Sequence, residues 1–400
     1  MRPYSGKRIL LGITGGIASY KSAWLARLLA KAGAEVDVVM TRAATEFVGA
    51  ITFEALTGRP VHTGLFEAGA ALDHIKLGRE AHAIVVAPGT ADFLARAATG
   101  QADDLLTATL LAATAPVLLV PAMNDHMWAH PQTVRNVAHL RSLGYQVLDP
   151  DEGMLAAGEG HGPGRMPEPE VVFAHIARLI EPPRLSGRRV LVTAGPTREP
   201  IDPVRFISNH SSGKMGVALA AAAWRRGADV DLVAGPLSVP APPGIAVHGV
   251  ESTEDMAAAV ERLLPHSDVL VMAAAPADFR PAVPAADKIK KSDAPASLSL
   301  LPTPDILNAT KAARRSGAVV VGFALETTDV LAGGKKKLVS KELDMIVVND
   351  ATEAGAGFGV DTNRVTLIMR DGDESRLPLM SKVEVADAIL DRVEKLIGGR

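Results

Sequence analysis

Short apolar runs alternate with longer amphipathic segments along the whole chain, and this alternation predicts its fold. Residues 8–14 form the first apolar run, a Gly15-Gly16 turn follows, and residues 17–32 have the spacing of a helix. Because the apolar runs are nearly continuous, they indicate strands of a parallel sheet covered on both faces. The other predicted strands of this half are residues 35–41, 83–87, 116–121 and 145–148.

A Gly- and Pro-rich stretch at residues 153–169 interrupts the pattern, and a helix follows at 170–180. Residues 182–189 have linker composition. The alternation then restarts, so the sequence predicts two α/β domains, 1–181 and 190–400, each a Rossmann-like or flavodoxin-like three-layer fold with a mostly parallel sheet. The second domain is expected to have helices at 212–226 and 382–397 and strands at 189–193, 230–234, 269–273, 319–323, 345–348 and 365–369.

Composition excludes several classes of function. The 400 residues are 48% hydrophobic and carry a net charge of −3, and no block of like charge exceeds Lys335–Lys337, so a nucleic-acid partner is not expected. No apolar run has the roughly 18 residues of a membrane span, and no signal peptide is recognised, so we expect a cytoplasmic protein without a membrane partner. The absence of cysteine excludes disulfides, thiolate metal sites and a cysteine nucleophile.

Polar turns follow the first three predicted strands. Gly12-Ile13-Thr14-Gly15-Gly16 places glycines where a strand becomes a helix, which suits a phosphate on main-chain N–H groups. The spacing differs from the G-x-G-x-x-G of NAD-binding folds. Thr41 and residues 87–90 end the next two strands, at the edge where open α/β sheets bind ligands. The three turns together suggest a mononucleotide, although each alone is also compatible with a turn packed against the sheet.

Two further segments carry side chains suited to a substrate. His74 follows a loop of small residues, where a single histidine can equally be structural or exposed. Residues 121–128, Pro-Ala-Met-Asn-Asp-His-Met-Trp, place the Asn124 amide among two methionines and an aromatic residue. Such a set suits a molecule that is part polar and part apolar.

A strand, a polar loop and a helix also meet at residues 207–216 in the second half. Amide groups in the first turn of a helix attract anions, so this junction is a candidate phosphate or carboxylate site. It is not a P-loop, because Ser208 and Met215 stand where that motif needs Gly and Ser or Thr. Arg205 and Asn209 lie on the same loop, and a short lysine cluster at 288–291 follows later.

Together these motifs resemble the flavin-dependent cysteine decarboxylase family. The whole chain resembles the family of bacterial bifunctional phosphopantothenoylcysteine decarboxylase/phosphopantothenate-cysteine ligases of coenzyme A synthesis, over nearly its full length. The specific marks are the turn at 15–21, His74 before Ile75, the 121–128 segment and Gly-Pro-Gly-Arg-Met at 162–166.

For the first half the resemblance implies FMN and a decarboxylase site, with His74 as the base and Asn124 holding the substrate carboxylate. Oxidation of the cysteine thiol to a thioaldehyde by the flavin would create an electron sink for loss of CO2. The near-neutral pKa typical of histidine suits transfer of the thiol proton. The residues implied in FMN binding are Gly15, Gly16, Ile17, Ser19, Thr41, Pro88 and Thr90.

The chain departs from this family in the substrate clamp. Residues 155–158 read Leu-Ala-Ala-Gly where the family has Ala-Cys-Gly, and Ala157 cannot donate the proton that the cysteine supplies. Two functions therefore stay open for this half: decarboxylation completed with another proton donor, or an active ligase fused to a flavin-binding domain that does not complete decarboxylation. An NAD-linked reductase is a third hypothesis, which the missing G-x-G-x-x-G disfavours.

For the second half the resemblance implies a ligase that activates 4'-phosphopantothenate with CTP as an acyl-cytidylate, which cysteine then attacks. Arg205 and Asn209 would bind phosphopantothenate and the intermediate, and Lys288 would assist its formation. Mg2+ is expected to offset the triphosphate charge, with ligands unknown, and Lys214 has no assigned role. The residues implied around CTP are Met272, Ala273, Ala274, Asp278, Lys288, Pro304, Asp305, Ile306, Leu307, Phe323, Lys337 and Lys341. The family also implies a homo-oligomer: trimeric decarboxylase and dimeric ligase domains in a dodecamer.

Overall fold

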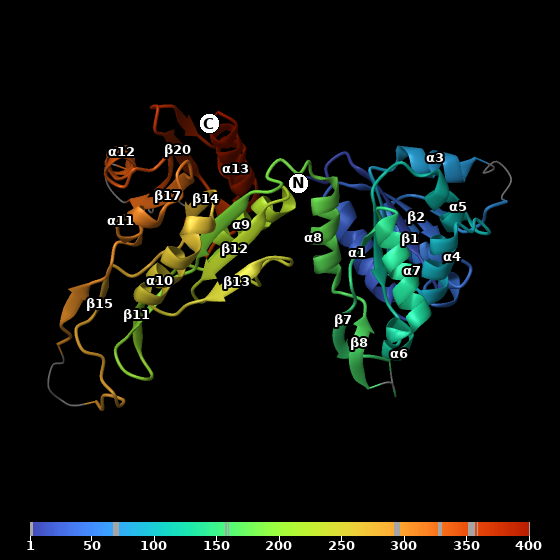
Figure 1. Ribbon diagram of the computed structural model, residues 1–400, viewed down its shortest axis with the longest axis horizontal. Helices are drawn as coiled ribbons and strands as arrows, with labels where there is room; N and C mark the ends of the chain where they lie inside the picture. Colours follow the sequence, from blue (N-terminus) through green and yellow to red (C-terminus); the bar gives the residue numbers. More distant parts are fainter. Residues whose placement is uncertain are drawn as a thin grey trace. The chain divides into compact units, whose positions relative to one another are not determined.

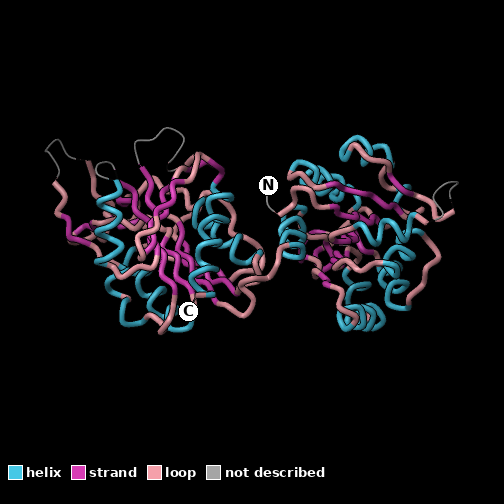
Figure 2. Tube along the Cα trace, turned by 90° about the horizontal axis from the view of Figure 1, so that it is seen from above, coloured by secondary structure: helices cyan, strands magenta, loops and turns pink. Residues whose placement is uncertain are grey.

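The computed structural model describes residues 3–66, 72–156, 158, 160–291, 297–326, 330–350, 357 and 359–399. The chain forms two compact units, Met1–Glu181 and Pro182–Arg400. Each unit has a central sheet with helices on both sides (Figure 1; Figure 2). The expected fold class, two three-layer α/β domains with mostly parallel sheets, is confirmed.

Unit 1 is built on a six-stranded parallel sheet in the order β3-β2-β1-β4-β5-β6. The strands are β1 (Arg8–Ile13), β2 (Glu35–Met40), β3 (Val61–His62), β4 (Ala83–Gly89), β5 (Val117–Pro121) and β6 (Gln146–Val147). The helices are α1 (Ser19–Lys31), α2 (Ala50–Thr57), α3 (Asp73–Glu80), α4 (Ala91–Thr99), α5 (Leu105–Ala112), α6 (Asp125–Ala129), α7 (Pro131–Ser142) and α8 (Pro169–Ile180), with a 3-10 turn at Ala44–Glu46.

Successive residues of β1 enter two different cores, one on each face of the sheet. Ile9 and Leu11 pack in the cluster that contains Leu25 of α1, whereas Leu10 packs in the cluster that contains Phe93 of α4. Full burial of each such side chain contributes about 1.5–3 kcal/mol. Because both faces are covered, the strand is a continuous apolar run rather than an alternating one.

An antiparallel hairpin, β7 (Asp151–Met154) and β8 (His161–Arg165), lies next to α6 (Figure 1). It occupies most of the Gly- and Pro-rich stretch for which the sequence predicts no element. The Gly164 carbonyl accepts from the Met123 amide at 3.0 Å, and a Cβ on Gly164 would lie 2.1 Å from the Met123 carbonyl oxygen. Glycine at 164 is therefore required for the hairpin to dock on the loop after β5.

Unit 2 contains an eight-stranded sheet in the order β13-β12-β9-β14-β17-β18-β20-β21. The first six strands of this order are parallel. β20 pairs antiparallel with β18, and β21 pairs antiparallel with β20. The strands are β9 (Arg189–Ala194), β12 (Asp229–Ala234), β13 (Ala246–Gly249), β14 (Val269–Met272), β17 (Val319–Glu326), β18 (Met345–Asp350), β20 (Val365–Met369) and β21 (Glu374–Arg376). The helices are α9 (Lys214–Arg225), α10 (Thr253–Leu263), α11 (Ile306–Ala309), α12 (Val330–Ser340) and α13 (Lys382–Gly398), with 3-10 turns at Leu264–His266 and Lys311–Ala313.

Three two-stranded ribbons accompany this sheet, and two of them extend from one end of unit 2 (Figure 1). They are β10 (Arg198–Pro200) with β11 (Phe206–Ser208), β15 (Phe279–Pro281) with β16 (Leu300–Pro302), and β19 (Thr362–Asn363) with β22 (Met380–Ser381).

The C-terminal helix α13 packs against α9 as part of the core of unit 2. Val385 and Ile389 are fully buried, and Arg226, at the end of α9, is 1% exposed. Its guanidinium pairs with Asp391 at 2.9 Å and Glu394 at 2.6 Å. Apolar packing and ion pairs therefore join the last helix to the rest of the unit. None of the helices described is both long and apolar enough to span a membrane.

Candidate active sites

A cavity of about 830 Å3 opens in unit 1 at the carboxyl ends of β1 and β4. This is the switch point of the strand order, where doubly wound sheets bind ligands. The volume lies within the range of about 300–1,000 Å3 for small-molecule sites. The structure brings these predicted residues into its wall: Gly15, Gly16, Ile17, Thr41, Thr90 and Asn124.

The turn between β1 and α1 offers main-chain donors to this cavity. The amide groups of Gly16, Ile17 and Ala18 have no hydrogen-bond partner among the described residues, and the positive end of α1 follows directly. A Cβ on Gly15 would lie 2.4 Å from the Ala43 Cβ, so only glycine fits there. The turn therefore suits the phosphate of a mononucleotide cofactor.

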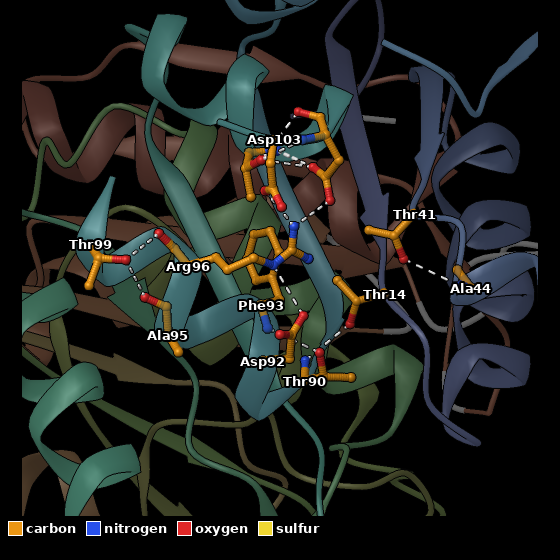
Figure 3. A network of polar contacts seen from close by, with 12 residues as sticks. Thr14, Thr41, Ala44, Thr90, Asp92, Phe93, Ala95, Arg96, Thr99 and Asp103 are labelled. Carbon is orange, nitrogen blue, oxygen red and sulfur yellow. Dashed lines mark hydrogen bonds and ion pairs between the residues drawn. The ribbon is translucent and has the colours of Figure 1, made fainter. Parts of the chain in front are cut away.

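Hydroxyl groups hold the strand ends on either side of the cavity together (Figure 3). Thr14 Oγ1 donates to the Pro88 carbonyl at 2.7 Å and accepts from the Thr90 amide at 3.0 Å. Ser19 is buried behind the turn, where its hydroxyl donates to the Gly16 carbonyl at 2.6 Å. Pro88 and Ser19 thus shape the cavity without being in its wall, whereas Thr41, which caps the turn at Ala44, lines it.

Arg96 and three carboxylates form a part of the wall that the sequence analysis missed. Figure 3 shows the Arg96 guanidinium directed toward Asp103, which it contacts at 3.0 Å. It also contacts Asp104 at 2.6 Å and Asp92 at 3.1 Å. Burial raises the pKa of Asp104, but hydrogen bonds from the Thr107 amide and Arg96 outweigh it and hold that pKa below its usual range. With three carboxylates around one guanidinium, this wall repels phosphate, which leaves the glycine turn as the anion site.

Asn124 presents a hydrogen-bond donor to the cavity. Its Oδ1 accepts from the His126 amide at 2.9 Å and caps α6. Because a backbone amide can only donate, this bond assigns the oxygen of the side chain and leaves the Nδ2 amino group for a ligand. That arrangement suits a bound carboxylate.

A buried lysine joins the glycine turn to the hairpin. Lys21, on α1, is 5% exposed, and its Nζ donates to the Met166 carbonyl at 2.7 Å and to Glu168 Oε1 at 3.1 Å. Glu168 also pairs with Arg165 of β8, which lines the cavity. The glycine turn and the hairpin, which both contribute to the wall of the cavity, are therefore both connected to α1.

His74 does not line the cavity of its own chain. It lies in the first turn of α3, and its Nδ1 is enclosed without a hydrogen-bond partner among the described residues. Leaving such an atom unpaired costs about 1–3 kcal/mol. Ala157 lies outside the described residues, although its neighbours Leu155 and Ala156 contribute to the wall.

In unit 2 a cavity of about 260 Å3 lies between the end of β14 and the start of α9. Its wall contains part of the expected nucleotide set, Ala273, Ala274, Asp278, Phe323 and Lys337. The polar junction also lines it, through residues 211–216. The site again lies at the switch point of the sheet, beside β9 and β14.

Two more lysines than expected face this cavity. Lys214, which has no role in the sequence analysis, lines it and donates to the Gly359 carbonyl at 2.9 Å and to Asp361 at 2.6 Å. Lys382 also lines it and is 7% exposed. Burial, together with the nearby Lys214 ammonium, lowers the pKa of Lys382. Three lysines against Asp278 in the wall favour an anionic ligand.

Asn349 of β18 adds a free acceptor to the same wall. The residue is 9% exposed, and its Nδ2 donates to Asn363 Oδ1 at 2.7 Å. Its own Oδ1 is buried without a partner among the described residues. No local sequence signal distinguishes these two asparagines, because they meet only when β18 and β20 pair in the sheet.

Arg205 and Asn209, expected to bind phosphopantothenate, and Lys288, expected to assist formation of the intermediate, lie outside the wall of this cavity. Asn209 Nδ2 donates to the carbonyls of Ala275 and Pro276, at 2.8 and 3.0 Å, and both of those residues line the cavity. Arg205 instead binds Asp202, with Nε at 2.9 Å from Oδ2. Lys288 is exposed on the following loop.

The remaining expected nucleotide residues are also outside the wall. Met272 is the buried last residue of β14, next to the lining residue Ala273. Residues 304–307 start α11, where Asp305 caps the helix and pairs with Lys341 at 3.2 Å. Ile306 and Leu307, within that range, are buried in the core.

Asp202 fixes the loop that carries Arg205, which gives a pH-dependent prediction. Hydrogen bonds from Arg205 hold the pKa of Asp202 well below its usual range, and the Val204 and Ile289 amides add to the effect. The stability that this carboxylate contributes is present above its unfolded pKa of about 3.9 and is lost as pH falls through the lower folded pKa. Asp202→Asn should therefore lower Tm at pH 7, with the difference from wild type narrowing below about pH 4. If thermal unfolding gave the same Tm difference between variant and wild type at pH 7 and below about pH 4, this role of Asp202 would be contradicted.

No group of three His, Asp or Glu side chains that would suit a metal occurs in the parts of the chain described. A metal held by phosphate oxygens and few protein groups, as Mg2+ commonly is, remains compatible with the unit 2 cavity.

Comparison with known proteins gives the class of the chain. The flavoprotein family matches residues 1–181, and the DNA/pantothenate metabolism flavoprotein C-terminal domain family matches residues 185–397. The protein is thus a two-domain flavoprotein of pantothenate metabolism.

Full-length relatives define the family more closely. The coenzyme A biosynthesis bifunctional protein CoaBC of Mycobacterium tuberculosis strain H37Rv is 48% identical over 98% of this chain and 97% of its own. CoaBC of Bacillus subtilis strain 168 is 45% identical over 98% of both chains. A crystal structure of a CoaBC C-terminal domain is 40% identical over 54% of this chain and 99% of its own, with a TM-score of 0.47.

The chain therefore belongs to the family of bifunctional coenzyme A biosynthesis proteins, with a decarboxylase flavoprotein domain and a ligase domain. This confirms the expected family and function. The alternative, a ligase fused to a flavin-binding domain that does not complete decarboxylation, has no support from these relatives.

Proposed function

We propose that unit 2 joins 4'-phosphopantothenate to cysteine with CTP and Mg2+ through an acyl-cytidylate, and that unit 1 decarboxylates the product to 4'-phosphopantetheine with FMN. The observation that carries the proposal is the pair of switch-point cavities, each lined by residues that the sequence assigns to its reaction. The two cavities belong to separate units of the same chain.

In unit 1 the free amides at 16–18 would hold the FMN phosphate, and Thr41 and Thr90 would line the remainder of the cofactor. The flavin supplies the two-electron oxidation of the cysteine thiol. The Asn124 amino group would donate to the substrate carboxylate, which orients the bond to be broken. Lys21 holds the segment that follows the hairpin through the Met166 carbonyl, and Met166 lines the same cavity as Asn124.

His74 is proposed as the base that accepts the thiol proton. The unpaired Nδ1 supports a role in binding, since a ligand or a partner subunit would satisfy it. Because His74 is not in the wall of its own chain, this assignment requires a homo-oligomer or a closing movement. We propose the oligomer, with trimeric decarboxylase and dimeric ligase domains as in the resembling family. Apolar side chains exposed on unit 1 support an interface there: Ile17, Tyr20, Trp24, Phe47 and Ile51.

In unit 2 the junction at 211–216 and the lysines Lys214, Lys337 and Lys382 would hold the CTP phosphates. Mg2+ would arrive with the triphosphate, with Asp278 as a nearby carboxylate. Asn209 would orient phosphopantothenate, and Arg205 and Lys288 would offset the charge of its reacting groups.

The test is a reaction of the full-length protein with phosphopantothenate, cysteine, CTP and Mg2+, followed by mass spectrometry. Pyrophosphate, CMP, CO2 and 4'-phosphopantetheine are expected, from a protein with oxidised-flavin absorbance. Accumulation of phosphopantothenoylcysteine without 4'-phosphopantetheine would contradict the unit 1 assignment, and no product at all would contradict both. Omission of CTP provides the control.

A further inference from the structure

A buried carboxylate of unit 2 lies outside the cavity wall and pairs with neutral donors. Glu199 is 1% exposed, and its Oε1 accepts from Thr197 Oγ1 at 3.0 Å, the Thr253 amide at 2.8 Å and Thr253 Oγ1 at 2.7 Å. Among the described residues it makes no ion pair with Lys or Arg. Burial of an unpaired carboxylate is costly, and the positive end of α10 at Thr253 offsets part of that cost.

The Thr197 hydroxyl connects the carboxylate to a neighbouring loop. Its Oγ1 lies 3.0 Å from Glu199 Oε1 and 2.9 Å from Thr253 Oγ1, and its lone pairs remain open to other donors. The Ala277 amide donates to it at 2.9 Å. The Thr197 carbonyl accepts in turn from Ser208 Oγ at 2.7 Å. Thr197 thus contacts two loops that are distant in the sequence.

Those two loops meet at Asn209. Ser208 immediately precedes Asn209, and Ala277 immediately follows Pro276. Asn209 Nδ2 donates to the carbonyls of Ala275 and Pro276. Neither Thr197 nor Glu199 lines the cavity, so any effect that they have on the reaction is indirect.

We infer that Thr197 and Glu199 form a positioning pair for ligation, which sets the distance between Asn209 and the 273–278 loop. The inference rests on the proposed ligase function of unit 2. Thr253 supports the pair from α10, and Thr303 adds a bond to the Ala277 carbonyl from the other side of the loop. These hydrogen bonds hold the 273–278 loop by its main-chain groups. The network therefore affects ligation through the position of the loop and not through contact with the substrate.

The experiment compares Thr197→Val, which removes the hydroxyl at nearly constant shape, with Thr197→Ser, which keeps it. Steady-state pyrophosphate release is measured with phosphopantothenate, CTP, cysteine and Mg2+, together with thermal unfolding. Thr197→Val should lower kcat at least about tenfold, with a smaller change in KM for CTP, because a small misplacement of a reacting group costs up to about 100-fold. Thr197→Ser should stay within about threefold of wild type.

A structural control is Glu394→Gln, which weakens the ion pair of Arg226 in the same unit. It should lower Tm and leave kcat unchanged. A folded Thr197→Val with wild-type kcat, or a Thr197→Ser that loses as much activity, would overturn the inference. If Thr197→Val does not fold, Glu199→Met against Glu199→Gln makes the same comparison, with loss of kcat expected only for methionine. Wild-type protein that releases no pyrophosphate would instead refute the proposed function, and the inference with it.

Discussion

Gly164→Ala is expected to lower the rate of decarboxylation about 100-fold while ligation in the same protein continues. The added Cβ would lie 2.1 Å from the Met123 carbonyl oxygen, and the backbone φ of +151° at this position disfavours any other residue. The hairpin must therefore move away from the loop that carries Asn124, which changes the wall around the reacting group. The measurement is conversion of phosphopantothenoylcysteine, with flavin absorbance to confirm that the cofactor remains.

Gly153→Ala provides a matched control in the same hairpin. Its Cβ would meet only the flexible Arg165 side chain, at 3.3 Å from Cδ, so decarboxylation should stay near the wild-type rate. Ligation by either variant checks that unit 2 is folded, and retained flavin absorbance checks unit 1. A Gly164→Ala protein that decarboxylates as fast as Gly153→Ala would show that the docked hairpin is not needed.

Asn209→Ala is expected to lower kcat/KM for ligation by about 100-fold or more. The side chain bridges the carbonyls of Ala275 and Pro276, and it is exposed, so its removal should cost little stability. Because these two carbonyls use both Nδ2 hydrogens, the substitution acts by releasing the 275–276 segment, and a small misplacement near the chemistry costs about 100-fold. The rate of pyrophosphate release, measured at varied phosphopantothenate concentration, gives kcat/KM for ligation directly.

Decarboxylation of supplied phosphopantothenoylcysteine by the Asn209→Ala protein should be unchanged. Asn136→Ala, the same substitution in unit 1, should leave ligation intact, because Asn136 contacts Gln132 within α7. Normal ligation by a folded Asn209→Ala protein would exclude Asn209 from the ligase site.

The sequence predicted the sheets better than the elements around them. The strand expected at 83–87 is β4, Ala83–Gly89, because a strand buried on both faces leaves a continuous apolar run. The β7–β8 hairpin was not predicted, because its glycines are required by contacts with residues distant in the sequence, such as that of Gly162 with Asp125. No local sequence pattern marks them. The short strand β13 has exposed residues and no apolar run, so it too gave no signal.

The residues of the candidate sites also fall into two groups, those that the sequence identified and those that it did not. Gly15, Thr90 and Asn124 were identified because each ends a strand or starts a helix, where the carboxyl edge of the sheet must place it. Arg96 and Lys382 come from helices, and only the packing of those helices brings them to a cavity. A solvated position and a cavity position on a helix have the same local sequence pattern, so these residues could not be recognised without the tertiary structure.

The docking of α13 also makes unit 2 the later of the two units to be completed during synthesis. Unit 1 ends at Glu181, so its sheet and cavity are complete once the first half of the chain has left the ribosome. The ligase cavity needs Lys382 and the packing of α13 against α9, which are synthesised after all of unit 1 and most of unit 2. A nascent chain is thus able to acquire its flavin before it is able to hold a nucleotide.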